Sequence, residues 1–232
     1  MNKIGIIGAM DEEINQLIEV LDHDTVTVKA QMEFHEGQLE GKPVVLVRSG
    51  IGKVNAGICA QILADVFDVS CIINTGIAGG MREEIHIGDI VISEDVLHHD
   101  VDAQGFGYER GQIPRMDTLS FPANRRLIEL ARQICTQVNP EIQVFVGRVL
   151  TGDQFIAEQA RKKEIQEWFH GDCTEMEGAA IAQAAYLNQL PFVIIRAISD
   201  NANEEATVDY PTFEKQAILH SVRLIKGLVQ AI

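Results

Sequence analysis

Short runs of β-branched and aliphatic residues alternate with helical patterns along the chain. Such runs predict buried strands, whereas apolar residues at helical spacing, as at Ile14, Leu17 and Leu21, predict helices. The predicted strands are residues 3–8, 25–30, 34–39, 44–47, 71–74, 89–93, 143–150 and 192–198. The predicted helices are residues 11–21, 125–137, 158–169, 176–187 and about 213–231, with another that carries Val54, Ile58 and Ile62.

Strands that alternate with helices are typical of a sheet covered by helices on both faces. We therefore expect an α/β fold: one domain over residues 1–232, with a central, mixed but mostly parallel, twisted sheet flanked by helices. Residues 75–80 are predicted to form a turn because they are rich in glycine, and residues 98–122 are predicted to form a long loop because periodicity is lost there. No linker, repeat or low-complexity segment divides the chain.

The composition and charge argue against some classes of binding partner. Of the 232 residues, 46% are hydrophobic and 23% charged, which is typical of a globular protein. A formal net charge of −15 argues against a nucleic acid or an anionic membrane as a partner. The N-terminal pattern is unlike a signal peptide, and no apolar run has the roughly 20 residues of a membrane helix. We expect a cytoplasmic protein.

Metal sites and reactive thiols have little support in the sequence. The four cysteines have none of the short spacings of a zinc or redox motif, and they are expected to be buried thiols. His98, His99 and Asp100 resemble a metal cluster, but adjacent residues on an extended segment point to opposite sides. We therefore expect no metal.

Acidic residues follow three of the predicted strands. They are Glu12 and Glu13, then residues 174–177, then Asp200 within residues 199–201. Each has a local structural explanation, respectively the helix dipole, a capping box from Thr174 to Glu177, and an Asx turn. Ligands in α/β sheets nevertheless bind beyond the carboxyl ends of the strands, so the three regions and residues 75–80 could line one crevice. Arg196, inside an apolar strand, needs a carboxylate or water network.

Six motifs add specificity, in this order: GIIGAMDEE (5–13), SGIGKVNA (49–56), INTGIAGG (73–80), FGYERGQIP (106–114), EMEGAAIA (175–182) and VIIRAISDNA (193–202). Through them the chain resembles, almost end to end, the 5′-methylthioadenosine/S-adenosylhomocysteine nucleosidase family of the purine nucleoside phosphorylase/hydrolase superfamily. The resemblance implies hydrolysis of the N-glycosidic bond of these two nucleosides, and possible hydrolysis of 5′-deoxyadenosine, to adenine and the 5-thioribose in methionine salvage. It also implies a cytoplasmic homodimer without cofactors.

The resemblance also implies roles for individual residues. Glu13 would hold and activate the attacking water, and Asp200, aided by Ser199, would protonate adenine N7. Met176 and Glu177 would bind the ribose. The other implied substrate-binding residues are Met10, Ile51, Ala78, Gly79, Phe155, Ile156, Arg196, Ala202 and Tyr210. The residues implied to reach the 5′-substituent pocket of the partner subunit are Ala103, Phe106, Tyr108 and Pro114.

The chemistry of the reaction fits these roles. Hydrolysis of an N-glycoside develops oxocarbenium character on the ribose and negative charge on the purine. An acid that protonates the purine and a carboxylate that holds the attacking water would therefore assist both halves of the reaction. Asp200 must then hold a proton near neutral pH, and Glu13 must accept one. One departure from the family is Ile77, where a serine is usual, which removes a polar contact and could alter catalysis or preference.

Three alternatives remain open on the sequence. A phosphorolytic relative needs cationic or amide donors at the first strand–helix junction, where this chain has Asp11, Glu12 and Glu13, so hydrolysis is favoured. A hydrolase of 6-amino-6-deoxyfutalosine would share the adenine end of the substrate. A catalytically silent nucleoside-binding protein would not need an acid, a water-holding carboxylate and a ribose carboxylate together.

Overall fold

The computed structural model describes residues 3–203 and 206–232, except for the side chains of residues 207–211. The strands are β1 (Lys3–Gly8), β2 (Asp22–Lys29), β3 (Met32–Leu39), β4 (Lys42–Arg48), β5 (Val69–Gly80), β6 (Ile90–His98), β7 (Phe121–Pro122), β8 (Val144–Thr151), β9 (Cys173–Glu175) and β10 (Phe192–Asp200). The helices are α1 (Asp11–Ile18), α2 (Lys53–Asp65), α3 (Arg125–Val138), α4 (Gln159–Phe169), α5 (Gly178–Leu187) and α6 (Ala206–Ala231), with a 3₁₀ turn at Gln104–Phe106.

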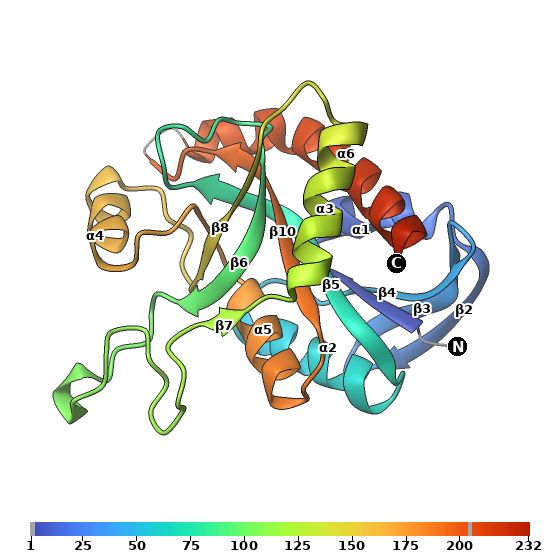
Figure 1. Ribbon diagram of the computed structural model, residues 1–232, viewed down its shortest axis with the longest axis horizontal. Coiled ribbons are helices and arrows are strands. Elements are labelled where there is room, and N and C mark those ends of the chain that lie inside the picture. The colour runs from blue at the N-terminus through green and yellow to red at the C-terminus, as the bar shows by residue number, and fades with distance from the viewer. Residues whose placement is uncertain (1–2, 204–205) are drawn as a thin grey trace.

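The strands form one sheet in the order β10-β6-β8-β9-β5-β1-β4-β3-β2, and β10 also pairs with β5. The strands β5, β10, β6, β8 and β9 therefore close into a ring, from which β1 to β4 extend as an open flank (Figure 1). Within the described residues, five strand pairs are parallel and five antiparallel. The α/β class is confirmed, but the expectation of a mostly parallel sheet was wrong. Tight turns make β2, β3 and β4 antiparallel neighbours, and β6 runs against β10.

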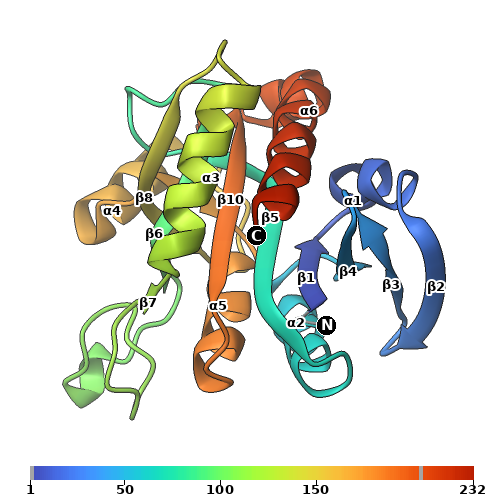
Figure 2. The same cartoon turned by 45° about the vertical axis from the view of Figure 1, so that its right-hand side comes forward.

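Helices cover both faces of the sheet. On one face α1, α3 and α6 pack over an apolar cluster that includes Ile6, Ile73 and Ile195. On the other face α2 and α5 lie side by side, away from α6, as Figure 2 shows. Strand β10 is buried along its whole length because both of its faces are covered. In the part of the chain that the structure describes, no helix combines the length and apolar character needed to cross a membrane.

Most predicted elements are present, with shifted ends. The predicted turn at residues 75–80 was wrong, because this segment continues β5 and pairs with β10 and β9. The predicted loop at residues 98–122 is mainly irregular but contains the 3₁₀ turn and β7. Helix α5 begins at Gly178 rather than 176, and α6 begins at Ala206 rather than near 213.

Candidate active site

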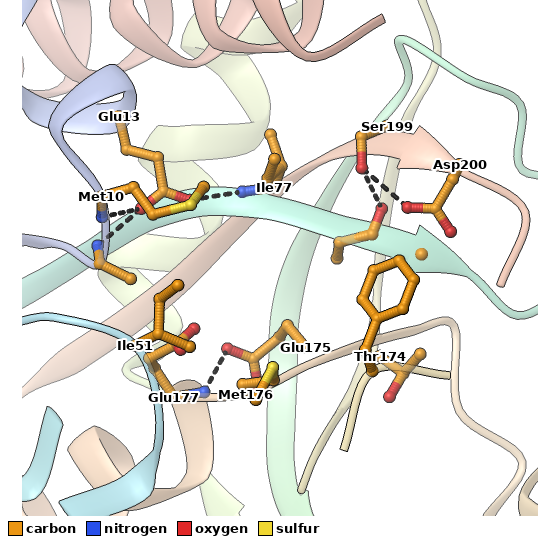
Figure 3. A pocket seen from close by; sticks show the side chains of 14 residues that line it. Met10, Glu13, Ile51, Ile77, Thr174, Glu175, Met176, Glu177, Ser199 and Asp200 are labelled. Atoms are coloured by element: carbon orange, nitrogen blue, oxygen red, sulfur yellow. Dashed lines mark hydrogen bonds between the residues drawn. The ribbon is translucent and has the colours of Figure 1, made fainter. Parts of the chain in front are cut away.

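A cavity of about 380 Å³ opens at the edge of the sheet where β1, β9 and β10 end. Figure 3 shows Glu13 and Met10 at one end of it and Ser199 and Asp200 at the other. The expectation that the acidic regions share one crevice is confirmed, since Glu13, Glu177 and Asp200 all line this cavity. Its lining residues are Ala9, Met10, Glu13, Ile51, Ile77, Ala78, Gly79, Phe155, Thr174, Glu175, Met176, Glu177, Ser199 and Asp200.

Glu13 lies in the first turn of α1, where its negative charge interacts favourably with the helix dipole. Its carboxylate also accepts three backbone hydrogen bonds. One carboxylate oxygen, Oε2, accepts hydrogen bonds from the backbone N–H of Ala9 at 2.6 Å and of Met10 at 3.0 Å. The other, Oε1, accepts one from the N–H of Ile77 on β5 at 3.1 Å. Burial raises the pKa of Glu13 above its usual value, and Arg196 and these three N–H groups oppose the rise.

Arg196 is the largest of the fully buried side chains, with 1% exposure. Its Nε donates to Oε2 of Glu175 at 3.1 Å, and Nη2 donates to Glu175 and, at 2.6 Å, to Oδ1 of Asn74. The sequence indicated that a buried guanidinium here needs a carboxylate, and Glu175 supplies it. Burial alone would lower the pKa of Arg196, but Glu175, Glu177 and Glu13 together hold it above its usual value.

Glu175, to which the sequence gave no role of its own within residues 174–177, organises the start of α5. Its Oε2 accepts the N–H groups of Glu177 at 3.1 Å and Gly178 at 2.7 Å, and its Oε1 accepts the hydroxyl of Thr151. The predicted capping box from Thr174 to Glu177 was therefore wrong. Glu177 is itself the N-cap residue and makes no side-chain cap bond. The buried Arg196 in the sequence was the signal that a second acid was required nearby.

Glu177 is left available to the cavity by this arrangement. Its Oε1 accepts a hydrogen bond from the N–H of Gly52 at 2.8 Å, and its Oε2 lies 3.9 Å from Nη2 of Arg196. Burial and repulsion by Glu175 raise the pKa of Glu177 to about 7, although Arg196 opposes the rise. A carboxylate with this pKa changes its charge near neutral pH.

Asp200 ends β10 at the other end of the cavity and is 2% exposed. Its Oδ2 accepts the hydroxyl of Ser199 at 2.9 Å, and its Oδ1 accepts the N–H of Ala202 at 2.8 Å. A β-carbon at Gly79 would lie 2.8 Å from Cβ of Ala202 and 2.9 Å from Oδ1 of Asp200. The absence of a side chain at Gly79 therefore lets the turn that carries Asp200 pack directly on β5.

Of the other residues implied by the family resemblance, some line the cavity and others do not. Ile51, Ala78, Phe155 and Met176 line it with the residues above. Ile156 and Ala202 are buried in a neighbouring apolar cluster instead of lining the cavity. The side chain of Tyr210 lies outside the described residues. Four residues of the irregular segment after β6 do not line the cavity of this chain: Ala103, Phe106, Tyr108 and Pro114.

Ile77, the departure from the family pattern, contributes to the site through its backbone. Its N–H binds Glu13, whereas its side chain packs in the apolar cluster beneath α1 and α6. No group of three potential metal ligands (His, Cys, Asp or Glu) occurs among residues 3–203 and 206–232. His98 and His99 are both buried, and burial lowers the pKa of His99 to about 4.

Comparison with known proteins shows the family to which the chain belongs. A family model described as the phosphorylase superfamily matches residues 3–231. The 5′-methylthioadenosine/S-adenosylhomocysteine nucleosidase of Geobacillus sp. strain WCH70 is 43% identical over 231 residues, which cover 99% of each protein. The chain belongs to this nucleosidase family of the phosphorylase superfamily. The nucleosidase of Colwellia psychrerythraea 34H, solved in complex with adenine, is similar at 39% identity and a TM-score of 0.95, covering 98% of this chain and 94% of that one.

A relative with another substrate has a similar fold. The futalosine hydrolase of Helicobacter pylori strain 26695 matches with a TM-score of 0.94, covering 100% of this chain and 98% of that one. Its sequence identity is 29%, the same as that of the 5′-methylthioadenosine/S-adenosylhomocysteine nucleosidase of Helicobacter pylori, which matches with a TM-score of 0.94. The fold is thus common to proteins of both names, and an identity of 29% does not separate them, whereas the two relatives at 43% and 39% identity are both nucleosidases.

Proposed function

We propose that the protein hydrolyses the N-glycosidic bond of 5′-methylthioadenosine and S-adenosylhomocysteine, releasing adenine and the 5-thioribose. The observation that carries this proposal is the placement of Glu13 and Asp200 at opposite ends of one cavity, which Glu177 also lines (Figure 3). A nucleoside that spans the cavity would present its purine to Asp200 and its ribose to Glu177. The sequence identity to nucleosidases of this specificity supports the choice of substrate.

The proposed chemistry follows from the contacts of each carboxylate. Asp200 protonates adenine N7 as the bond to the ribose breaks, and Ser199 orients the Asp200 carboxyl. Glu13, fixed by three backbone N–H groups, holds the water and takes its proton, and its raised pKa suits this task. Glu177 accepts hydrogen bonds from the ribose hydroxyls. Arg196 holds Glu175, and its positive charge lowers the cost of burying the acids around it.

The test is adenine release from 5′-methylthioadenosine in buffer without phosphate or added metal. We expect release by the wild type, and a rate that does not change when phosphate is added. A rate that requires phosphate would establish phosphorolysis instead. Tight binding of an adenosine analogue without adenine release would establish a silent binding protein. Glu13→Gln is the matched variant, because it keeps the side-chain shape and removes the base.

The alternative substrate 6-amino-6-deoxyfutalosine has the same adenine end and a different 5′ group. The relatives at 43% and 39% identity are both 5′-methylthioadenosine/S-adenosylhomocysteine nucleosidases, which favours the thio-substituted nucleosides. A panel of the three substrates, compared by kcat/KM, distinguishes the two activities. We expect the highest value for 5′-methylthioadenosine or S-adenosylhomocysteine.

The protein also acts as a homodimer in this proposal. Val54 on α2 and Leu187 on α5 are 71% and 63% exposed, and both border one groove. Phe106, at the 3₁₀ turn, is 87% exposed. The exposed apolar side chains of this groove support a protein interface, and Phe106 and Tyr108 would enter the partner's site. Size-exclusion chromatography with light scattering at several concentrations tests the dimer, and Val54→Lys should yield monomers.

We further propose that residues 1–232 act as a single domain in the cytoplasm. The shared sheet, to which segments from β1 to β10 contribute, supports the first point. Limited proteolysis should release no stable half, and fractionation should recover the protein with cytoplasmic markers.

A further inference from the structure

Lys162 reaches from α4 to the turn that carries Asp200. Its Nζ donates a hydrogen bond to the backbone oxygen of Asn201 at 2.7 Å. Lys162 is partly buried in a groove, whereas its neighbour Lys163 is exposed and lies 3.9 Å from Glu167. The two lysines therefore differ in environment although they are adjacent in sequence.

The turn of residues 200–202, which Lys162 contacts through Asn201, is closely packed against β5. Gly79 packs against Ala202, and the N–H of Ala202 binds Oδ1 of Asp200. Ala202 has a φ of +50°, in the left-handed region that non-glycine residues seldom adopt. The orientation of the Asp200 carboxyl thus depends on the backbone of residues 200–202, and Lys162 holds the outer side of that backbone through Asn201.

We propose that Lys162 is a positioning residue for the proton donor, one that fixes the turn of residues 200–202 and places a positive charge next to Asp200. This inference rests on the proposed role of Asp200. The side chain acts through the turn and through its charge, without contacting the substrate.

Asp200 is among the charged groups that interact with Lys162. Burial lowers the pKa of Lys162, and Asp200 and Glu83 oppose the fall, so both carboxylates interact with its ammonium group. Glu13, Glu175 and Glu177 line the same cavity as Asp200. The other charged or titratable groups that line the groove are Arg82, Glu84, Lys163, Glu167 and His170.

The proposal predicts a pH effect as well as a loss of rate. A nearby positive charge favours the ionised form of a carboxyl, so removal of the charge lets Asp200 keep its proton to higher pH. We expect Lys162→Met to move the alkaline limb of the kcat profile upward by about half a pH unit or more. We also expect kcat to fall by about tenfold, with a change in KM of less than about threefold, because the donor is displaced.

The experiment compares Lys162→Met, Lys162→Arg and the control Lys163→Met in adenine release between pH 5 and 10, with melting temperatures measured in parallel. We expect the alkaline limb of the kcat profile to be shifted upward in Lys162→Met and to match the wild type in Lys162→Arg. We expect Lys163→Met to leave the profile unchanged. An unshifted limb in Lys162→Met, or an equal shift in Lys163→Met, overturns it. A wild type that releases no adenine refutes the proposed function itself, whereas an active wild type with unshifted variants refutes only the role of Lys162.

Discussion

Replacement of Gly76 by alanine would place a methyl group between two buried charged groups. A β-carbon at this position of β5 would lie 2.4 Å from Nη1 of Arg196 and 2.7 Å from Oε1 of Glu13. Neither group can move freely, because Arg196 is fixed by Asn74 and Glu175, and Glu13 is fixed by three backbone N–H groups. The substitution must therefore displace at least one of them.

The substitution has a structural cost and a kinetic cost. An extra methyl group in a well-packed interior costs about 1–3 kcal/mol of stability. Displacement of Glu13, the proposed base, costs part of the roughly 10²–10⁴-fold in rate that one acid–base group contributes. We therefore expect Gly76→Ala to lower kcat/KM for 5′-methylthioadenosine by about 100-fold. For a chain of this size, about 2 kcal/mol of destabilisation also lowers the melting temperature by roughly 4–8 °C.

The assay is adenine release followed by absorbance, together with thermal unfolding followed by circular dichroism. Gly5→Ala on β1 is the matched control, because its β-carbon would lie 3.1 Å from Cδ1 of Leu63, the end of a flexible side chain. We expect Gly5→Ala to lower the melting temperature slightly and to keep kcat/KM within about threefold of the wild type. A Gly76→Ala protein with wild-type kcat/KM would refute the claim that Arg196 and Glu13 must keep these positions.

Asp200→Asn should fold normally and lose about 10²–10⁴-fold in kcat, because the amide cannot donate the proton; near-wild-type adenine release would contradict the assignment. The pKa of Glu177 is about 7 in the folded protein, against a usual value of 4.5, so the folded state binds more protons between these values and stability falls as pH rises from about 4.5 to about 7. Urea unfolding should show that Glu177→Gln lessens this fall, and an unchanged slope would argue against the raised pKa. Ile77→Ser should cost about 2–4 kcal/mol of unfolding free energy through the apolar space it leaves, yet keep kcat/KM within about tenfold, since the contact to Glu13 uses the backbone.

The buried strands that position the site could be predicted from local sequence. Residues 4–8 are apolar, and residues 192–198 are apolar except for Arg196, and such runs form strands that are covered on both faces. Since ligand sites lie beyond the carboxyl ends of such strands, the positions of Glu13 and Asp200 followed from the chain alone. The cavity contains both side chains.

The end of β5 could not be predicted in this way. Thr75–Gly80 contains three glycines, a composition that favours a turn when only local sequence is considered. The segment remains extended because β10 and β9 pair with it, and because Arg196, Glu13 and Ala202 occupy the space where side chains would be. These contacts are long-range, so no local pattern contains them.

The roles of Glu175 and Glu177 also depend on a distant residue. The spacing from Thr174 to Glu177 matches a capping box and therefore predicted that the side chain of Glu177 caps the helix. In the structure Glu175 accepts the N–H groups at the start of α5 instead. Arg196 decides the outcome, because its guanidinium binds Glu175 and thereby fixes that carboxylate over the first turn of α5. Glu177 is then free to face the cavity.

The most direct measurement is a crystal structure with a 5′-methylthioadenosine analogue that cannot be hydrolysed. The analogue should span the cavity with its purine N7 position within hydrogen-bond distance of Asp200, its ribose hydroxyls on Glu177, and a water between Glu13 and the anomeric carbon. An analogue bound in the reverse direction, with the purine at Glu13, or bound outside this cavity, would contradict the account.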